Sequence, residues 1–214
     1  MSQLHEQYRP RTWAEVVGQD KIVDRINLLR NRGLTGRAYW LSGKSGTGKT
    51  TIARLIAGEV ADEWGTEEID AEGLTPARVQ ELERSSFVRG LGERGGRAVI
   101  INEAHGLRKA TIRQLLVTLE RVSPHAVWCF TTTADGEESL FEECVDAHPL
   151  LSRCVVLSLA QSGLAKAFAE RAKQIAKAEG LDCVSFERYV NLVKEHRNNF
   201  RAVLQAIESG QLAA

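Results

Sequence analysis

The chain has 214 residues, of which 43% are hydrophobic and 26% are charged. This length allows one medium domain with a small one appended. No apolar run approaches the ~18 residues of a membrane span and the N-terminus has no signal-like segment, so we expect a soluble, cytoplasmic protein with no membrane partner. Lys plus Arg and Asp plus Glu balance at 28 each, which leaves only a local patch for nucleic acid. The cysteines form no C-x-x-C pair, which favours reduced thiols over a metal site.

Strands and helices are expected to alternate over the first part of the chain. Pro10 keeps the opening stretch irregular, and Asp20 is expected to cap a helix. Short apolar runs then predict four strands, at residues 38–41, 97–102, 126–131 and 154–159. Between them, helical spacing of apolar residues predicts helices over 50–60 and around 112–119. This alternation predicts an α/β fold, with a parallel sheet covered by helices on both faces.

Beyond Leu159 the pattern becomes helical only. We expect a helix over 163–179 capped by Ser162, a second starting at Ser185, and a third from Asn198 or Asn199 to Gly210. The predicted division is an α/β domain over residues 1–159 and a small helical lid domain over residues 160–214.

A phosphate-binding loop is the strongest motif. Residues 43–50 read Gly-Lys-Ser-Gly-Thr-Gly-Lys-Thr, which satisfies G-x-x-x-x-G-K-[ST] between an apolar strand and a helix. Glycines let backbone N–H groups turn inward, Lys49 reaches the terminal phosphates, and the Thr50 hydroxyl is a Mg²⁺ ligand. We therefore predict ATP and Mg²⁺ as cofactors. The predicted nucleotide-binding residues here are Gly43, Gly46, Thr47, Gly48, Lys49, Thr50 and Thr51.

A second acidic site follows the strand that ends at Asn102. P-loop ATPases have a carboxylate pair here, and this chain has Asn102 and Glu103. Asn102 can accept a hydrogen bond from metal-bound water without supplying charge, so Thr50 and Asn102 are the predicted metal residues. Glu103 can polarise the attacking water as a general base; the alternative is a solvated residue at a strand end. For His105, packing or capping is the favoured interpretation.

These motifs resemble those of AAA+ ATPases, and most closely the small subunits of DNA clamp loaders: replication factor C and the bacterial gamma-type and delta-prime subunits. The resemblance covers nearly the whole chain. It rests on these segments: Tyr8-Arg-Pro-Arg-Thr-Trp13, Val16-Val-Gly-Gln19, the P-loop, Glu68-Ile-Asp-Ala71, Ile101-Asn-Glu-Ala-His105, Leu116-Val-Thr-Leu-Glu120 and Leu151-Ser-Arg-Cys154.

The resemblance implies further roles. The N-terminal segment, with Tyr8, Arg9 and Val17, would cradle the adenine. Arg153 in Ser-Arg-Cys would be an arginine finger that enters the ATP site of a neighbouring AAA+ subunit. Thr132 would be the sensor that holds the attacking water, and Arg201 a second sensor on the lid. The alternatives are an ordinary strand threonine at 132 and surface arginines at 153 and 201.

The chain also departs from the family pattern. Because the sequence ends at Ala214, we expect a family member that lacks the helical collar domain, and the four-cysteine zinc module of the gamma-type subunits is absent between residues 51 and 97. The loop over 135–149 is longer and more acidic than the family's. Asn102 in place of an aspartate predicts slow hydrolysis. Basic residues could gather on a face turned toward duplex DNA, or simply be solvated: Arg78, Arg84, Arg89, Arg94, Arg108 and Lys109.

Three functional hypotheses follow. The leading one is an ATPase with sites shared between subunits, which couples ATP to remodelling of a partner such as a sliding clamp on primed DNA. The second is a nucleotide-gated binding or regulatory module with little or no hydrolysis, which Asn102 favours. The third, a small-molecule kinase, fits the Ser-Arg-Cys motif and the helical lid less well.

Overall fold

The computed structural model describes residues 3–90, 92–143 and 147–212. Its contacts divide the chain into two units. The sheet unit comprises Asp24–Gly43 and Lys49–Ser158, and the helical unit comprises Met1–Val23, Lys44–Gly48 and Leu159–Ala214. The helical unit therefore includes the N-terminal segment and the tip of the P-loop, residues 44–48, as well as the C-terminal helices. A division into two domains between residues 159 and 160 stays a prediction.

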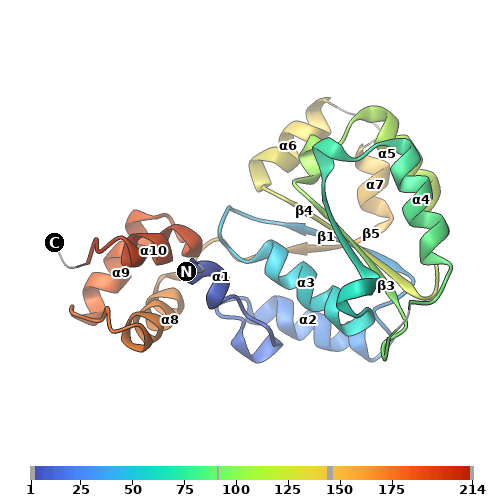
Figure 1. Cartoon of the computed structure of the whole chain (residues 1–214). Helices are drawn as coiled ribbons and strands as arrows, with labels where there is room; N and C mark the ends of the chain where they lie inside the picture. The colour runs from blue at the N-terminus through green and yellow to red at the C-terminus, as the bar shows by residue number, and fades with distance from the viewer. Residues whose placement is uncertain (1–2, 91, 144–146, 213–214) are drawn as a thin grey trace. The chain divides into compact units, whose positions relative to one another are not determined.

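The sheet unit is built on a sheet of parallel strands, four of which are labelled in Figure 1. Within the described residues the sheet has five strands in the order β2-β3-β4-β1-β5. The strands are β1 (Arg37–Ser42), β2 (Thr66–Asp70), β3 (Arg97–Asn102), β4 (Ala126–Thr132) and β5 (Cys154–Ser158). Their buried side chains include Trp40 and Phe130, whose ring centroids lie 5.6 Å apart. Continuous apolar runs arise because parallel strands covered on both faces expose neither face to water.

Helices cover both faces of this sheet. They are α2 (Asp20–Arg30), α3 (Lys49–Val60), α4 (Pro76–Ser86), α5 (Lys109–Leu119), α6 (Ala134–Glu143) and α7 (Ala147–Ser152). Helix α3 packs on β1, β3 and β4. Helices α4, α5 and α7 bury Leu82, Leu115 and Leu150 in one core with Trp40 and Phe130. The predicted α/β fold is confirmed.

The structure corrects two predictions about the sheet unit. Strand β2 was missed because it lies at the edge of the sheet, where Glu67, Glu68 and Asp70 interrupt any apolar run. The segment predicted as an acidic loop over 135–149 contains α6 and, after residues outside the described range, the start of α7. The acidic first turn of α6 complements the positive end of the helix dipole, and Leu140 is buried in the core.

The helical unit contains α1 (Leu4–Gln7), α8 (Ala165–Ala178), α9 (Phe186–Glu195) and α10 (Phe200–Glu208) around a core of its own. Asn199 caps α10, because its side chain accepts a hydrogen bond from the Ala202 N–H. The predicted cap at Ser162 is wrong: α8 begins after Leu164, which is buried in the core. Asp20 is the first residue of α2 rather than its cap.

Short 3₁₀ turns complete the description: η1 (Trp13–Glu15), η2 (Glu63–Gly65), η3 (Ala71–Gly73) and η4 (Ala104–Gly106). In the part of the chain that the structure describes, no helix has both the length and the apolar character needed to cross a membrane.

Candidate nucleotide-binding site

The P-loop runs from the end of β1 into the first turn of α3. Gly46 has φ of 74° and Gly48 has φ of 103°, a backbone region that side chains other than glycine rarely adopt. Lys49 is 7% exposed, and its Nζ donates to the Gly43 carbonyl oxygen at 3.0 Å. The Thr47 hydroxyl donates to the Lys44 carbonyl oxygen at 2.7 Å. A glycine-rich turn, a helix N-terminus and an ammonium group fit the phosphates of a nucleotide.

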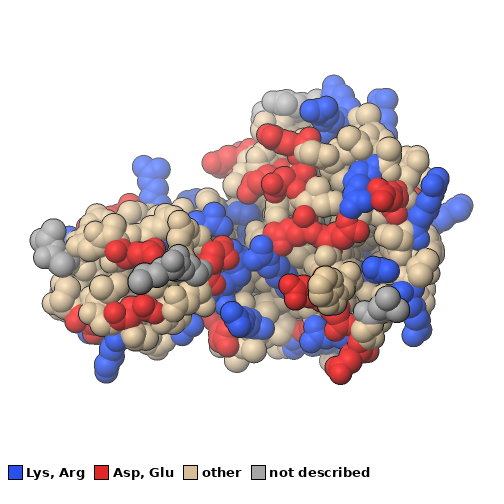
Figure 2. All heavy atoms as spheres, viewed as in Figure 1, with Lys and Arg blue, Asp and Glu red and all other residues tan. Residues whose placement is uncertain are grey.

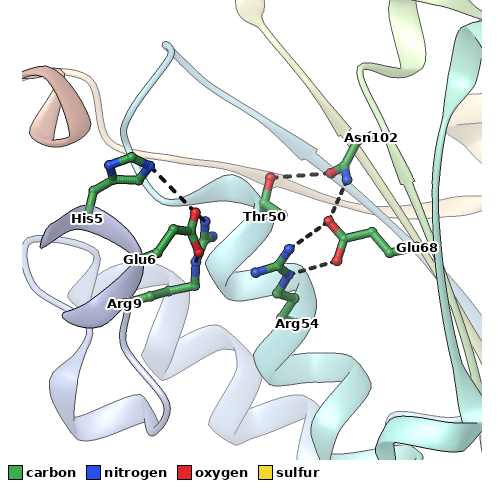
Figure 3. A network of polar contacts seen from close by, with 7 residues as sticks. All are labelled: His5, Glu6, Arg9, Thr50, Arg54, Glu68 and Asn102. Atoms are coloured by element: carbon green, nitrogen blue, oxygen red, sulfur yellow. Dashed lines mark hydrogen bonds and ion pairs between the residues drawn. The ribbon is translucent and has the colours of Figure 1, made fainter. Parts of the chain in front are cut away.

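Asn102 lies at the carboxyl end of β3, beside the first turn of α3 (Figure 3). Its Oδ1 accepts hydrogen bonds from the Thr50 hydroxyl at 3.3 Å and from the Thr131 hydroxyl at 3.0 Å. Its Nδ2 donates to Glu68 Oε1 at 2.7 Å. A threonine hydroxyl and an amide oxygen are hard oxygen donors of the kind that Mg²⁺ prefers. The two predicted metal residues are therefore brought together in the sheet unit.

Glu103 follows Asn102 in a left-handed conformation, with φ of 50° and ψ of 51°. This conformation is uncommon for a residue with a side chain, and such residues cluster at functional sites. Glu103 Oε2 lies 3.5 Å from His105 Nδ1, which lies 3.3 Å from the hydroxyl of the buried Thr132. The predicted base and the predicted sensor thus both contact His105. The histidine ring also packs against Gly136, where an added Cβ would lie 2.6 Å from the ring.

Arg153 is held by its own chain. Its Nη2 lies 2.5 Å from Glu120 Oε1, at the end of α5, and its Nη1 donates to the Pro149 carbonyl oxygen at 2.9 Å. Among the described residues, its buried Nε has no hydrogen-bond partner. The predicted arginine finger is therefore held by the end of α5 and by α7.

The residues predicted to cradle the adenine lie in the helical unit. The Tyr8 hydroxyl donates to Glu179 Oε1 at 2.6 Å, and this hydrogen bond raises the pKa of Tyr8. Val17 packs against the core of the helical unit. Arg9 pairs with Glu6, its Nε lying 3.0 Å from Oε2 (Figure 3).

The tip of the P-loop contacts the start of α10 within the helical unit. The Phe200 N–H donates to the Gly46 carbonyl oxygen at 3.2 Å, and the Asn199 side chain packs directly against Gly46. Arg201, the predicted second sensor, is exposed in this first turn of α10. The tip of the loop, residues 44–48, and the predicted sensor therefore lie in the same unit.

Sequence reasoning missed three residues, each of which contacts a predicted site residue of its own unit. Buried Gln19 donates from Nε2 to the Thr47 carbonyl oxygen at 3.4 Å and accepts from the Ala160 N–H at 2.8 Å. Glu68 contacts Asn102, and Asn199 contacts Gly46. Glu68 and Asn102 are far apart in the chain. Their contact could have been predicted only if β2 had been predicted as a neighbour of β3.

The basic residues predicted to face DNA are partly engaged with acidic groups. Arg78 pairs with Glu67 and, at 2.7 Å, with Glu81. The other five residues are exposed: Arg84, Arg89, Arg94, Arg108 and Lys109. Figure 2 shows Lys and Arg interspersed with Asp and Glu over the face in view.

The fold and the P-loop define a P-loop ATPase of α/β architecture. Residues 39–150 match the sequence profile of the ATPase family associated with various cellular activities (AAA). The chain belongs to this family, which supports ATPase activity as its general function.

The relatives found are of the kind that the sequence predicted. The chain is 30% identical over 155 residues to the DNA polymerase III subunit gamma/tau of Mycobacterium tuberculosis, covering 61% of this chain and 27% of that protein. It is 30% identical over 189 residues to the replication factor C small subunit of Haloarcula marismortui, covering 83% of this chain and 53% of that protein. The chain thus spans about a quarter to a half of these curated relatives.

A solved structure carries the same fold. The Thermotoga maritima RuvB Holliday junction branch migration motor superimposes with a TM-score of 0.72 at 22% identity, covering 94% of this chain and 64% of that chain. At this identity the similarity concerns the fold alone.

Proposed function

We propose that the chain binds ATP with Mg²⁺ and hydrolyses it at sites shared between AAA+ subunits, either copies of itself or related chains. The observation that carries the proposal is the junction of the P-loop helix with the end of β3, where the Thr50 hydroxyl lies 3.3 Å from Asn102 Oδ1. Phosphates at the Lys49 ammonium and a metal at Thr50 would lie beside Glu103, the residue that follows Asn102.

Each residue then has a defined task. Lys49 and the loop N–H groups bind the phosphates, and Thr50 with Asn102 holds the metal or its water. Mg²⁺, when bound, supplies positive charge at the phosphates. Glu103 orients and polarises the attacking water, His105 fixes the position of the Glu103 carboxylate, and Thr132 holds the same water. Arg153 of one subunit adds positive charge at the phosphates held by its neighbour.

The similarity to gamma/tau and to replication factor C small subunits supports a clamp-loader type of work: remodelling a partner, such as a sliding clamp that is loaded onto primed DNA. The exposed basic residues of the predicted patch are candidates for the DNA contact: Arg84, Arg89, Arg94, Arg108 and Lys109. Affinity for primed duplex in the presence of ATP should fall with rising salt, because phosphate contacts release counterions. Binding that is absent with ATP, or insensitive to salt, would contradict the DNA contact.

A second function, a nucleotide-gated binding or regulatory module with little or no hydrolysis, is favoured by two observations. Asn102 carries no charge at the metal site, and Arg153 is bound to Glu120 of its own chain. Hydrolysis per subunit, measured as a function of protein concentration, separates the two. Shared sites predict a rate that rises as subunits assemble, whereas the module predicts a uniformly negligible rate.

Arg153→Ala sharpens this test. An arginine finger is worth about 10³ to 10⁵ in turnover, so the variant should lose nearly all hydrolysis while ATP binding is little changed. Arg30→Ala is the matched control, because Arg30 is similarly exposed (33% against 28%) and also pairs with a glutamate. Equal rates for Arg153→Ala, Arg30→Ala and the wild type at every concentration would contradict the shared site.

A further inference from the structure

The side-chain amide of Asn102 is held at both ends. Two hydroxyls, of Thr50 and Thr131, face Oδ1 at 3.3 and 3.0 Å, and the Glu68 carboxylate faces Nδ2 at 2.7 Å (Figure 3). A carboxylate only accepts hydrogen bonds, so the atom that faces it must be the amide nitrogen. The orientation of the Asn102 amide is therefore set by Glu68.

Glu68 is in turn held by Arg54, one turn beyond Thr50 on α3. The guanidinium binds the carboxylate at both oxygens: Nε lies 2.7 Å from Oε2, and Nη2 lies 3.1 Å from Oε1. A planar, two-point contact of this kind fixes the position of the carboxylate as well as its charge. Arg54, Glu68, Asn102 and Thr50 thus form a closed chain of contacts that starts and ends on α3.

We propose that Glu68 is a positioning residue for the metal site: it binds the amide N–H of Asn102 and thereby keeps the Asn102 carbonyl oxygen turned toward the Thr50 hydroxyl. This inference rests on the proposed function, since the Thr50 side is where the metal binds. Without Glu68, the amide is free to rotate and present its NH₂ group, which repels a cation, to the metal.

The contact also explains why asparagine suits position 102. Asn102 Nδ2 lies 2.7 Å from Glu68 Oε1, so an aspartate at position 102 would place a second carboxylate oxygen against Glu68 without a hydrogen to donate. Two carboxylates this close each disfavour the charged form of the other. Asn102 and Glu68 are therefore complementary, and changing one residue alone breaks the contact.

The alternative is a surface ion pair between Glu68 and Arg54 that only adds stability. Both side chains are partly exposed, at 28% and 43%, and such pairs contribute little to stability. If the ion pair only adds stability, substitution of Glu68 should not alter the Mg²⁺ dependence of ATP binding. Magnesium dependence is therefore the readout that separates the two roles.

The test measures ATP binding by calorimetry at increasing Mg²⁺ concentration, and in EDTA, for the full chain. Removing an outer partner of a metal site typically costs 10- to 100-fold in metal affinity. Glu68→Ala should therefore raise the Mg²⁺ concentration that gives half-maximal enhancement of ATP binding by about tenfold. ATP binding in EDTA should be unchanged. Glu68→Gln keeps an acceptor oxygen for the Asn102 amide and should remain close to the wild type.

A matched control and a swap complete the design. Glu59→Ala removes a carboxylate that is equally exposed (30%) and equally paired with an arginine, and it should leave the magnesium dependence unchanged. Asn102→Asp alone should bring no gain in apparent Mg²⁺ affinity, whereas Asn102→Asp combined with Glu68→Gln restores a donor and acceptor pair and should recover at least wild-type affinity.

Three results would overturn the inference. The first is the same magnesium dependence for Glu68→Ala and Glu59→Ala. The second is an Asn102→Asp variant with the same apparent Mg²⁺ affinity as the double variant Asn102→Asp, Glu68→Gln. This comparison tests the inference even if Glu68→Ala does not fold. The third is the absence of magnesium-dependent ATP binding in the wild type. Of the three results, only this one would also overturn the proposed function.

Discussion

Gly46→Ala tests the contact between the P-loop tip and α10. An added Cβ would lie 1.9 Å from Asn199 Oδ1 and 2.9 Å from Asn199 Cα, at a φ of 74°. The left-handed backbone costs an alanine about 1–2 kcal/mol, and overpacking costs about 1–3 kcal/mol more. If Asn199 swings away instead, α10 loses its cap, at about 1 kcal/mol. We expect Gly46→Ala to lower the free energy of unfolding by about 2–5 kcal/mol.

Gly48→Ala is the matched control. Gly48 also has a positive φ, of 103°, but an added Cβ there meets no atom of the described residues within 4 Å. Only the backbone term remains, about 1–2 kcal/mol. The difference between the two variants therefore isolates the Asn199 contact, and it should be about 1–3 kcal/mol.

The assay is equilibrium urea denaturation without nucleotide, followed by circular dichroism. The double variant Gly46→Ala, Asn199→Ala should recover part of the loss, because the side chain that clashes is gone. If Gly46→Ala costs no more than Gly48→Ala, the packing of the loop tip on α10 is not as described.

Two further predictions concern the sheet unit. Burial raises the pKa of the Cys154 thiol to about 12 from an unfolded value of 9.0, and that of Cys129 also rises. A raised thiol pKa contributes stability that is complete below the unfolded value, so the free energy of unfolding should fall as pH rises above about 9, measured by urea denaturation between pH 7 and 11. A flat profile over this range would contradict the burial of the thiols. Glu120→Gln should change stability by at most about 1 kcal/mol, because the Glu120 side chain that binds Arg153 is 59% exposed. A larger loss in thermal denaturation would mean that Arg153 has a structural role.

Sequence patterns predicted the parts of the fold that are buried or chemically constrained. The strands β1, β3 and β4 have apolar runs because they lie inside the sheet, and β5 keeps one although it lies at an edge. The P-loop was identified because glycine, lysine and threonine are required at fixed spacing. The alternation of these elements was sufficient to predict the parallel sheet.

Other features depend on contacts between distant residues. Strand β2 was missed because an edge strand tolerates Glu67 and Glu68, and the contact of Glu68 with Asn102 exists only because β2 lies beside β3. The packing of Asn199 against Gly46 has no local signal, since each residue serves its own helix or loop. The roles of Glu103, Thr132, Arg153 and Arg201 stay predictions.

ATP binding to Lys49→Ala tests the central claim most directly. Lys49 is the buried cation of the P-loop, and Lys109→Ala is the control that removes the same charge from an exposed position in the sheet unit. In titration calorimetry with Mg²⁺, the wild type and Lys109→Ala should bind ATP with equal affinity, whereas Lys49→Ala should show no measurable binding while circular dichroism reports an intact fold. Undiminished affinity in a folded Lys49→Ala protein would contradict nucleotide binding at this loop.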